Sequence, residues 1–386
     1  MRRCWLWTTS IGIAALGLTA AGLTGCGPSD QERQEFETRA LMREIFSGLR
    51  EALPASAGPD PFGDPAQREE ILSALETLSD NATLLEGHSA RRDEQERFLA
   101  RSVARDARDV LREYRAGHEP RAAFLLQQIT ENCVACHTRL PAPKDSPLAR
   151  GFLEEPALED LPLEARARLQ VATRRFDEAL ETLEERIASD VHPALLLGAI
   201  TDYLVVSIRV KGDYERPLAT LAGFAERPDL WTRLRRDVER WIEVLPGLRF
   251  RASGDPDVAK ARTLIDEGRA LDAMEGDHAS LAHLVVASSV LQRYVASNRR
   301  QSRALAEAYY LLGVLEAEIG RSYWVTPAPF LLEQAIRIAP DASFALDAFA
   351  LLEQELLMSY EGADEEALPA EEVARLRELE SLLRSG

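Results

Sequence analysis

The sequence predicts an all-α protein in two parts, an N-terminal four-helix bundle and a C-terminal array of helical repeats. Between residues 30 and 140, four segments carry apolar residues at the i, i+3, i+4 and i+7 spacing of one buried helix face. From residue 163 onward the same spacing returns, interrupted by turn-forming residues at intervals typical of helical hairpins. A Pro-rich stretch of mixed charge, residues 143–162, predicts a linker between the two parts.

The first predicted helix covers residues 29–53, because Ser29 and Asp30 favour a helix start and Pro54 disfavours continuation. Its predicted buried face comprises Met42, Ile45, Phe46, Leu49 and Leu53. The other three helices of the bundle are predicted over residues 65–85, 92–116 and 121–140. Because short connections join these amphipathic helices, we expect an antiparallel bundle that ends near residue 142.

Parts of the second segment, residues 163–386, resemble tetratricopeptide repeats. Residues 174–187 and 212–227 resemble second helices of such repeats. Residues 306–320, followed by 329–342, resemble a complete unit, although the spacing between units is irregular. Stacked helix pairs leave a concave surface that suits a protein or peptide partner. Aromatic residues that either line this surface or fill the core are Trp231, Trp241, Tyr309, Tyr310, Tyr323 and Trp324.

The start of the chain has the features of a secretory signal peptide. Arg2 and Arg3 precede an uncharged apolar run over residues 5–23. The sequence Leu-Thr-Gly-Cys, which ends at Cys26, resembles the lipobox of bacterial lipoproteins, in which the cysteine becomes the lipid-bearing N-terminus. The alternatives are an ordinary secretory signal and an uncleaved anchor helix. The resemblance implies a signal peptide over residues 1–25 and a lipid-anchored protein on the periplasmic side of a bacterial membrane, inner or outer.

The charge of the chain limits its partners. The 386 residues carry a formal charge of −18, and removal of the two arginines of the leader gives −20. Such an acidic chain disfavours a nucleic-acid partner and favours partners with basic surfaces. After the leader, no apolar run is long enough to span a bilayer, so the lipid is the one predicted membrane contact.

Cysteine counting narrows the chemistry. Of four cysteines, Cys133 and Cys136 remain once the leader and the lipid site are set aside, and they form the motif Cys-Val-Ala-Cys-His with His137. A structural zinc site needs four ligands, and no second cysteine pair exists. A thioredoxin-like dithiol starts a helix in a βαβ unit, whereas this motif closes a helical segment. One covalent haem c, a disulfide and chance spacing remain, and haem uses all three side chains, two as thioethers and the histidine as axial ligand of iron.

Four helices with this motif at the end of the last helix resemble the class II c-type cytochromes, the cytochrome c′ and c-556 group. The resemblance covers residues 26–142 and implies that Cys133 and Cys136 bind the haem and that His137 is the proximal ligand. In c-556-like members a methionine of the first helix ligates the distal side, and Met42 in Arg-Ala-Leu-Met-Arg-Glu-Ile-Phe is the match. In five-coordinate members an apolar residue leaves that side open to NO or CO. The alternative role of Met42 is core packing.

Four further histidines and one arginine are weaker candidates for contact with haem or a metal ion. His88 and His118 fall in predicted turns and are expected to be exposed, and Arg139 either pairs with a haem propionate or is exposed. His278 and His283 are five residues apart, which places them on different helix faces and argues against a metal site. No catalytic dyad or triad and no second haem motif occur, so we predict no enzymatic activity.

Two functions follow from these observations. The first is electron transfer by a membrane-tethered, extracytoplasmic, mono-haem c-type cytochrome that docks a redox partner through its helical repeats. The second is a haem-bearing scaffold or binding lipoprotein that senses a small ligand or serves a transporter. The transporter alternative arises because the repeats distantly resemble those of lipoproteins that accompany some periplasmic substrate transporters.

Overall fold

The computed structural model describes residues 30–56, 60, 62–89, 94–137, 161–272, 274, 277–298, 300–319, 327–360, 368 and 370–385. Within these ranges the chain forms helices and no β-strand, which confirms the all-α prediction. Several residues considered above lie outside the described ranges, namely the leader with Cys26, the linker up to residue 160, Arg139, Tyr323 and Trp324.

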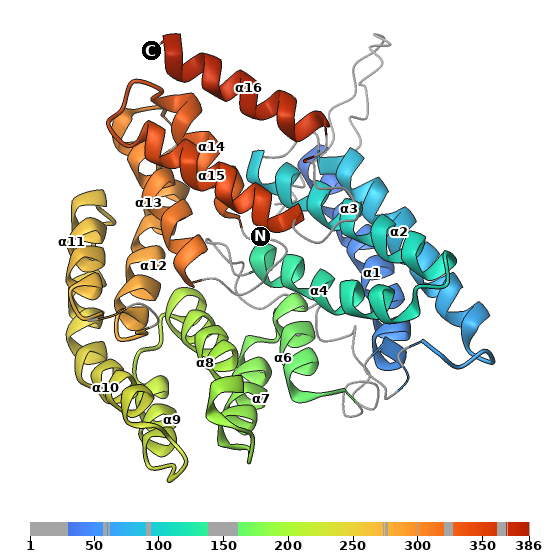
Figure 1. Ribbon diagram of the computed structural model, residues 1–386, viewed down its shortest axis with the longest axis horizontal. Helices are drawn as coiled ribbons and strands as arrows, with labels where there is room; N and C mark the ends of the chain where they lie inside the picture. Colours follow the sequence, from blue (N-terminus) through green and yellow to red (C-terminus); the bar gives the residue numbers. More distant parts are fainter. Residues whose placement is uncertain are drawn as a thin grey trace, which may run out of the picture.

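Four helices, which we call the first part, begin the fold (Figure 1): α1 (Asp30–Ser56), α2 (Arg68–Ser89), α3 (Glu94–Arg115) and α4 (Glu119–His137). Each packs against the next, α1 also packs against α4, and together they enclose one apolar core. α1 and α2 run in opposite directions, since His88 at the end of α2 lies 3.1 Å from the carbonyl oxygen of Gln34 near the start of α1. α2 and α3 do so too, since the Tyr114 hydroxyl at the end of α3 donates to the carbonyl of Arg68 at the start of α2. The predicted core residues Ile45, Phe46, Leu49 and Leu53 are buried.

Two of these helices extend beyond their predicted ends. α1 continues through Pro54 to Ser56, because a proline in the last turn removes little of the remaining backbone hydrogen bonding. The Ser56 hydroxyl donates to the carbonyl of Leu53 at 2.8 Å and satisfies one of the final carbonyl groups. α2 continues to Ser89, so His88 lies in a helical turn and not in a loop.

The second part consists of α6 (Leu163–Ala172), α7 (Phe176–Ala188), α8 (Leu197–Leu204), α9 (Arg216–Ala225), α10 (Thr232–Ala252), α11 (Val258–Arg269), α12 (Leu281–Ser297), α13 (Arg303–Ile319), α14 (Ala328–Ile338), α15 (Ala345–Tyr360) and α16 (Ala370–Ser385). A short 3-10 helix, Pro193–Leu195, precedes α8, and a π-helical segment, Val205–Lys211, follows it. Many helices adjacent in sequence pack together, such as α6 with α7, α11 with α12 and α13 with α14, and Figure 1 shows a curved path from α6 to α16.

Gly313 allows α13 and α14 to pack closely. A Cβ atom at Gly313 would lie 2.8 Å from Cγ of Leu332, a separation that real Cβ contacts essentially never show. The crossing therefore requires a residue without a side chain. Ala335, on the facing helix, is fully buried. The segment that resembles a complete repeat unit is thus a tightly packed helix pair.

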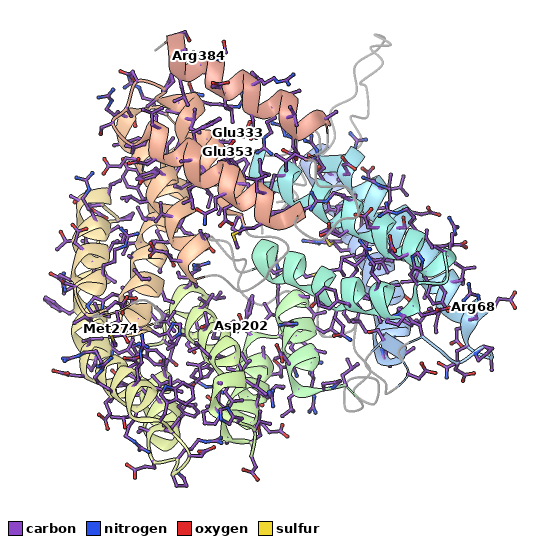
Figure 2. The ribbon with its side chains drawn as sticks, viewed as in Figure 1. Arg68, Asp202, Met274, Glu333, Glu353 and Arg384 are labelled. Atoms are coloured by element: carbon purple, nitrogen blue, oxygen red, sulfur yellow. The ribbon has the colours of Figure 1, made fainter. Side chains whose placement is uncertain are left out.

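The two parts contact each other at one end of the first part. Leu161, just before α6, and Leu169, within it, belong to the apolar core that α1–α4 enclose. Because α6 also packs against α7, it contributes to both parts. At the start of α3, the ring of Phe98 lies 5.7 Å from the ring of Phe330 in α14. Arg68 lies at the opposite end of the first part, away from the second part (Figure 2). The end that faces the second part is the end where α4 finishes.

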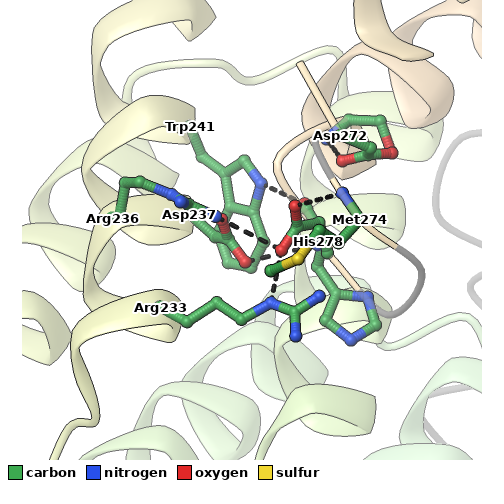
Figure 3. A network of polar contacts seen from close by, with 9 residues as sticks. Arg233, Arg236, Asp237, Trp241, Asp272, Met274 and His278 are labelled. Carbon is green, nitrogen blue, oxygen red and sulfur yellow. Dashed lines mark hydrogen bonds and ion pairs between the residues drawn. The ribbon is translucent and has the colours of Figure 1, made fainter. Parts of the chain in front are cut away.

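A polar network fixes the loop between α11 and α12 onto α10 (Figure 3). The buried carboxylate of Asp277 contacts the guanidinium groups of Arg233 and Arg236. The Trp241 indole donates to the backbone carbonyl of His278 at 2.7 Å. Because buried carboxylates require such partners, the network accounts for the loop position as a feature of the fold.

Candidate haem site

The register of α1 and α4 places the Cys-Val-Ala-Cys-His motif near Met42 along the helix axis. The Gln127 side-chain amide in α4 donates to the carbonyl of Ser56 in α1 at 2.9 Å, which fixes the two antiparallel helices. His137 lies ten residues beyond Gln127, so it is level with Phe46, ten residues before Ser56. At a rise of about 1.5 Å per residue, Met42 lies about 6 Å further along the axis.

Met42 and Cys133 pack against the same apolar core. Both side chains are half-buried and contact the cluster formed by α1–α4. The Cys133 thiol lies 3.8 Å from the carbonyl of Ile129, the residue one turn earlier in α4. Cys136 also lies in α4, three residues later, but its side chain is outside the part of the structure that is described.

His137 is the last residue of α4, and its imidazole lies against the end of α6. The Nδ1 atom is buried and has no hydrogen-bond partner in the part of the chain that the structure describes. The backbone carbonyls of Val171 and Ala172 are hydrogen-bond partners of the ring. Burial, and then the positive charge of Arg174, lower the pKa of His137 to about 4, although the two carbonyls oppose this shift. The imidazole is therefore neutral at pH 7.

These features fit a haem ligand. A histidine must be neutral to bind a metal, and His137 is neutral with one ring nitrogen unused. Metal-ligating histidines commonly donate their other ring N–H to a backbone carbonyl, which Val171 and Ala172 provide here. In contrast, the described residues include no cluster of three or more His, Cys, Asp or Glu side chains that would hold a metal ion.

The structure brings some predicted site residues together and separates others. Met42 and Cys133 share the core of the first part, whereas the imidazole of His137 faces α6. Contrary to the expected exposure of His88, its side chain is only 15% exposed, and its Nδ1 lies 3.4 Å from the Glu37 carboxylate in α1. His118, largely exposed, lies 3.0 Å from the Glu113 carboxylate. The last two histidines thus have local partners and are not directed at the motif.

Most of the second-part residues that the sequence singled out pack in the core or against neighbouring aromatic rings. Trp241 and His283 are buried, and Trp231 is exposed and stacks on His192 with ring centroids 6.2 Å apart. Tyr309 and Tyr310 are half-buried and contact Phe330 and Phe344 respectively. Burial of His283 lowers its pKa, so it is a neutral core residue at pH 7.

Sequence reasoning missed α6 and Arg174 as neighbours of the motif. A left-handed backbone position after a helix normally carries Gly or Asn, and residue 174 is an arginine with φ of 60°. The spacing of α6 also gives no indication that it packs on α4. The only signal in the sequence was that α6 carries small and apolar residues, such as Ala165, Ala167 and Leu169, and this does not specify a partner helix.

The described residues contain no helix that combines the length and hydrophobicity needed to cross a membrane. Comparisons of the chain with protein-family models, with curated proteins and with solved structures found no match.

Proposed function

We propose that this chain is a membrane-tethered, extracytoplasmic, mono-haem c-type cytochrome that transfers electrons. The observation that carries the proposal is the state of His137, a half-buried residue at the end of a Cys-Val-Ala-Cys-His helix. Its imidazole is neutral, and its buried Nδ1 has no hydrogen-bond partner in the described part of the chain. The register of α1 and α4, which brings Met42 to the same end of the first part, supports it.

In this proposal α1–α4 form a class II-type bundle. Cys133 and Cys136 would hold the haem through thioethers, His137 would ligate the iron, and Met42 would complete the coordination from α1. When bound, haem supplies a one-electron couple whose potential a methionine ligand raises. The chain itself surrounds the site with apolar side chains, which exclude water and fix the positions of the ligating groups.

The second part is proposed to be a degenerate tetratricopeptide-like array that docks the partner. The close α13–α14 pair at Gly313 and the curved succession of helices support this assignment. A net charge of −20 after removal of the leader (−18 minus two arginines) favours a redox protein with a basic surface. Lipidation at Cys26 would hold the chain at the periplasmic face of a membrane.

One observation favours a second function, a haem-bearing sensor or scaffold. Met42 packs against the core of the first part, whereas the His137 ring lies against the end of α6. A haem that kept this arrangement would have an open distal side, which permits the binding of CO or NO.

Spectroscopy of the purified chain, expressed together with haem-attachment machinery, tests both functions. A pyridine haemochrome spectrum typical of haem c is expected, and its absence would refute both. Electron transfer with Met42 as ligand requires a low-spin spectrum that does not respond to CO. A high-spin spectrum with ready CO binding would refute that function and support the sensor.

The variant Met42→Ala separates ligation from core packing. If Met42 ligates the iron, the spectrum changes from low spin to high spin and the reduced protein gains CO binding. Met358→Ala is the matched control, because Met358 is 50% exposed in α15 and far along the chain from the motif. Cys133→Ser combined with Cys136→Ser should abolish covalent haem, since no thioether can form.

A further inference from the structure

Two loops of the second part bring exposed apolar side chains together. Trp231, just before α10, is 42% exposed, and its indole stacks on the His192 ring of the α7–α8 loop with ring centroids 6.2 Å apart. Leu195, in the 3-10 turn that follows His192, is 68% exposed, and its amide donates to the His192 carbonyl at 2.9 Å. We call these three residues the Trp231 surface. Exposed apolar side chains that are gathered in one place mark interaction sites, whereas isolated ones need no explanation.

Arg227 ties the two loops to each other. It lies in the turn between α9 and α10, and its guanidinium donates to the carbonyls of Ser189 at 2.7 Å and Val191 at 2.8 Å in the α7–α8 loop. Arg235, in the first turn of α10, donates to the backbone carbonyl of Arg227 at 2.7 Å. Because these bonds fix both loops before a partner arrives, binding at the Trp231 surface requires little further ordering of the chain.

The charges of the two loops favour a positively charged partner. Residues 189–196 and 226–231 contain three carboxylates, Asp190, Glu226 and Asp229, and one guanidinium, Arg227, so their formal charge is −2, one positive minus three negative. Arg227 bonds to Asp229 at 2.7 Å and also attracts Asp190, so one cation serves two carboxylates. Among the described residues, exposed Glu226 forms neither a hydrogen bond nor an ion pair.

We propose that the Trp231 surface docks a protein segment that carries lysine or arginine side chains around an apolar anchor. The anchor would pack on the Trp231 indole and on Leu195, and the cations would pair with Asp190 and Glu226. Tryptophan is among the residues that most often dominate the binding energy of an interface, and charges at its rim steer a partner of opposite sign. The inference rests on the docking role proposed for the second part, to which it adds the site and the chemistry of the partner, and it does not require haem.

Fluorescence anisotropy of labelled peptides tests this surface. The probe is a fluorescein-labelled peptide of the repeating pair Lys-Leu, and peptides of equal length with Lys-Ser or Glu-Leu test charge and apolar contact separately. Only the Lys-Leu peptide should bind well. Trp231→Ser and Leu195→Ser should each weaken this binding at least about tenfold, whereas Trp231→Phe keeps an aromatic ring and should retain most of it. Asp190→Asn combined with Glu226→Gln should weaken binding and make it less dependent on salt.

Phe250→Ser is the matched control. Phe250 is 83% exposed near the other end of α10, roughly 28 Å from Trp231 at 1.5 Å per residue, so the variant should bind like the parent. Binding that Trp231→Ser and Leu195→Ser leave unaltered, or that Phe250→Ser weakens equally, would overturn the surface. Thermal unfolding shows whether each variant is folded, and the mostly exposed Leu195 keeps the test valid if Trp231→Ser is not.

The remaining outcomes separate the partner from other occupants. Equal binding of the Lys-Ser or the Glu-Leu peptide would overturn the stated partner chemistry. So would association with phosphatidylcholine vesicles, or with a second copy of the chain in sedimentation, that depends on Trp231 while the Lys-Leu peptide does not bind. A haem-bearing chain that binds no peptide would overturn the surface alone, whereas a chain that binds the peptide but attaches no haem would refute the proposed electron transfer and leave the surface intact.

Discussion

Substitution of Gly48 by Ala should loosen the contact between α1 and α2. A Cβ atom at Gly48 would lie 2.6 Å from the carbonyl oxygen of Ala74 and 3.0 Å from the amide nitrogen of Leu78. Both are backbone atoms of α2, so neither can rotate away. Ordinary contact begins at 3.4 Å, which means that the helices must separate by about 0.8 Å, the difference between 3.4 and 2.6 Å.

The expected loss follows from two opposing effects. Overpacking of this kind costs about 1–3 kcal/mol, and contact with backbone places Gly48→Ala at the upper end. Replacing glycine by alanine in a helix returns about 1 kcal/mol through helix propensity. The net expectation is a loss of about 2 kcal/mol in the free energy of unfolding. Because Met42 lies on the same helix, its position relative to α4 should also change.

Urea unfolding followed by far-UV circular dichroism measures this loss, with Gly87→Ala as the matched control. Gly87 lies in α2 of the same first part, and a Cβ atom there would meet nothing within 4 Å. Gly87→Ala should therefore unfold at the same or a higher urea concentration than the parent. If Gly48→Ala proved as stable as Gly87→Ala, the close approach of α1 and α2 would be refuted.

Three further predictions concern other regions. Arg209 is 5% exposed and forms an ion pair with Glu316 at 2.8 Å. Arg209→Met should therefore lower the free energy of unfolding, measured by denaturant titration, by about 3–5 kcal/mol, because it leaves the Glu316 charge without its partner. Adding Glu316→Gln removes that charge and should restore part of the loss. The pKa of Glu113 lies below 4.5, chiefly because His118 hydrogen-bonds to it. The stability that this contributes is present above pH 4.5 and is lost as the pH falls through the lowered pKa. Glu113→Gln should therefore make the free energy of unfolding depend less on pH on the acid side. Cys26→Ser should move the chain from the membrane to the soluble fraction on cell fractionation, and a chain that stays on the membrane would exclude lipidation as the anchor.

The helical segments and the motif were predictable because both depend on local sequence. Apolar spacing gave the four helices of the first part to within a few residues, since burial of one face requires that period. The errors were at helix ends: Pro54 did not stop α1, and His88 stayed helical. Helix ends depend on partners such as the Ser56 hydroxyl and the Gln34 carbonyl, which a local pattern does not reveal.

The sequence by itself determined the all-α class and predicts the chemistry of the motif, because helix periodicity and the spacing of Cys133, Cys136 and His137 are properties of contiguous residues. Only the tertiary structure decided what surrounds His137. The seating of α6 on α4 arises from packing between helices that a stretch of chain separates in the sequence. Such packing depends on the complementary shapes of several helices at once, and therefore it could not be derived from the pattern of any one of them.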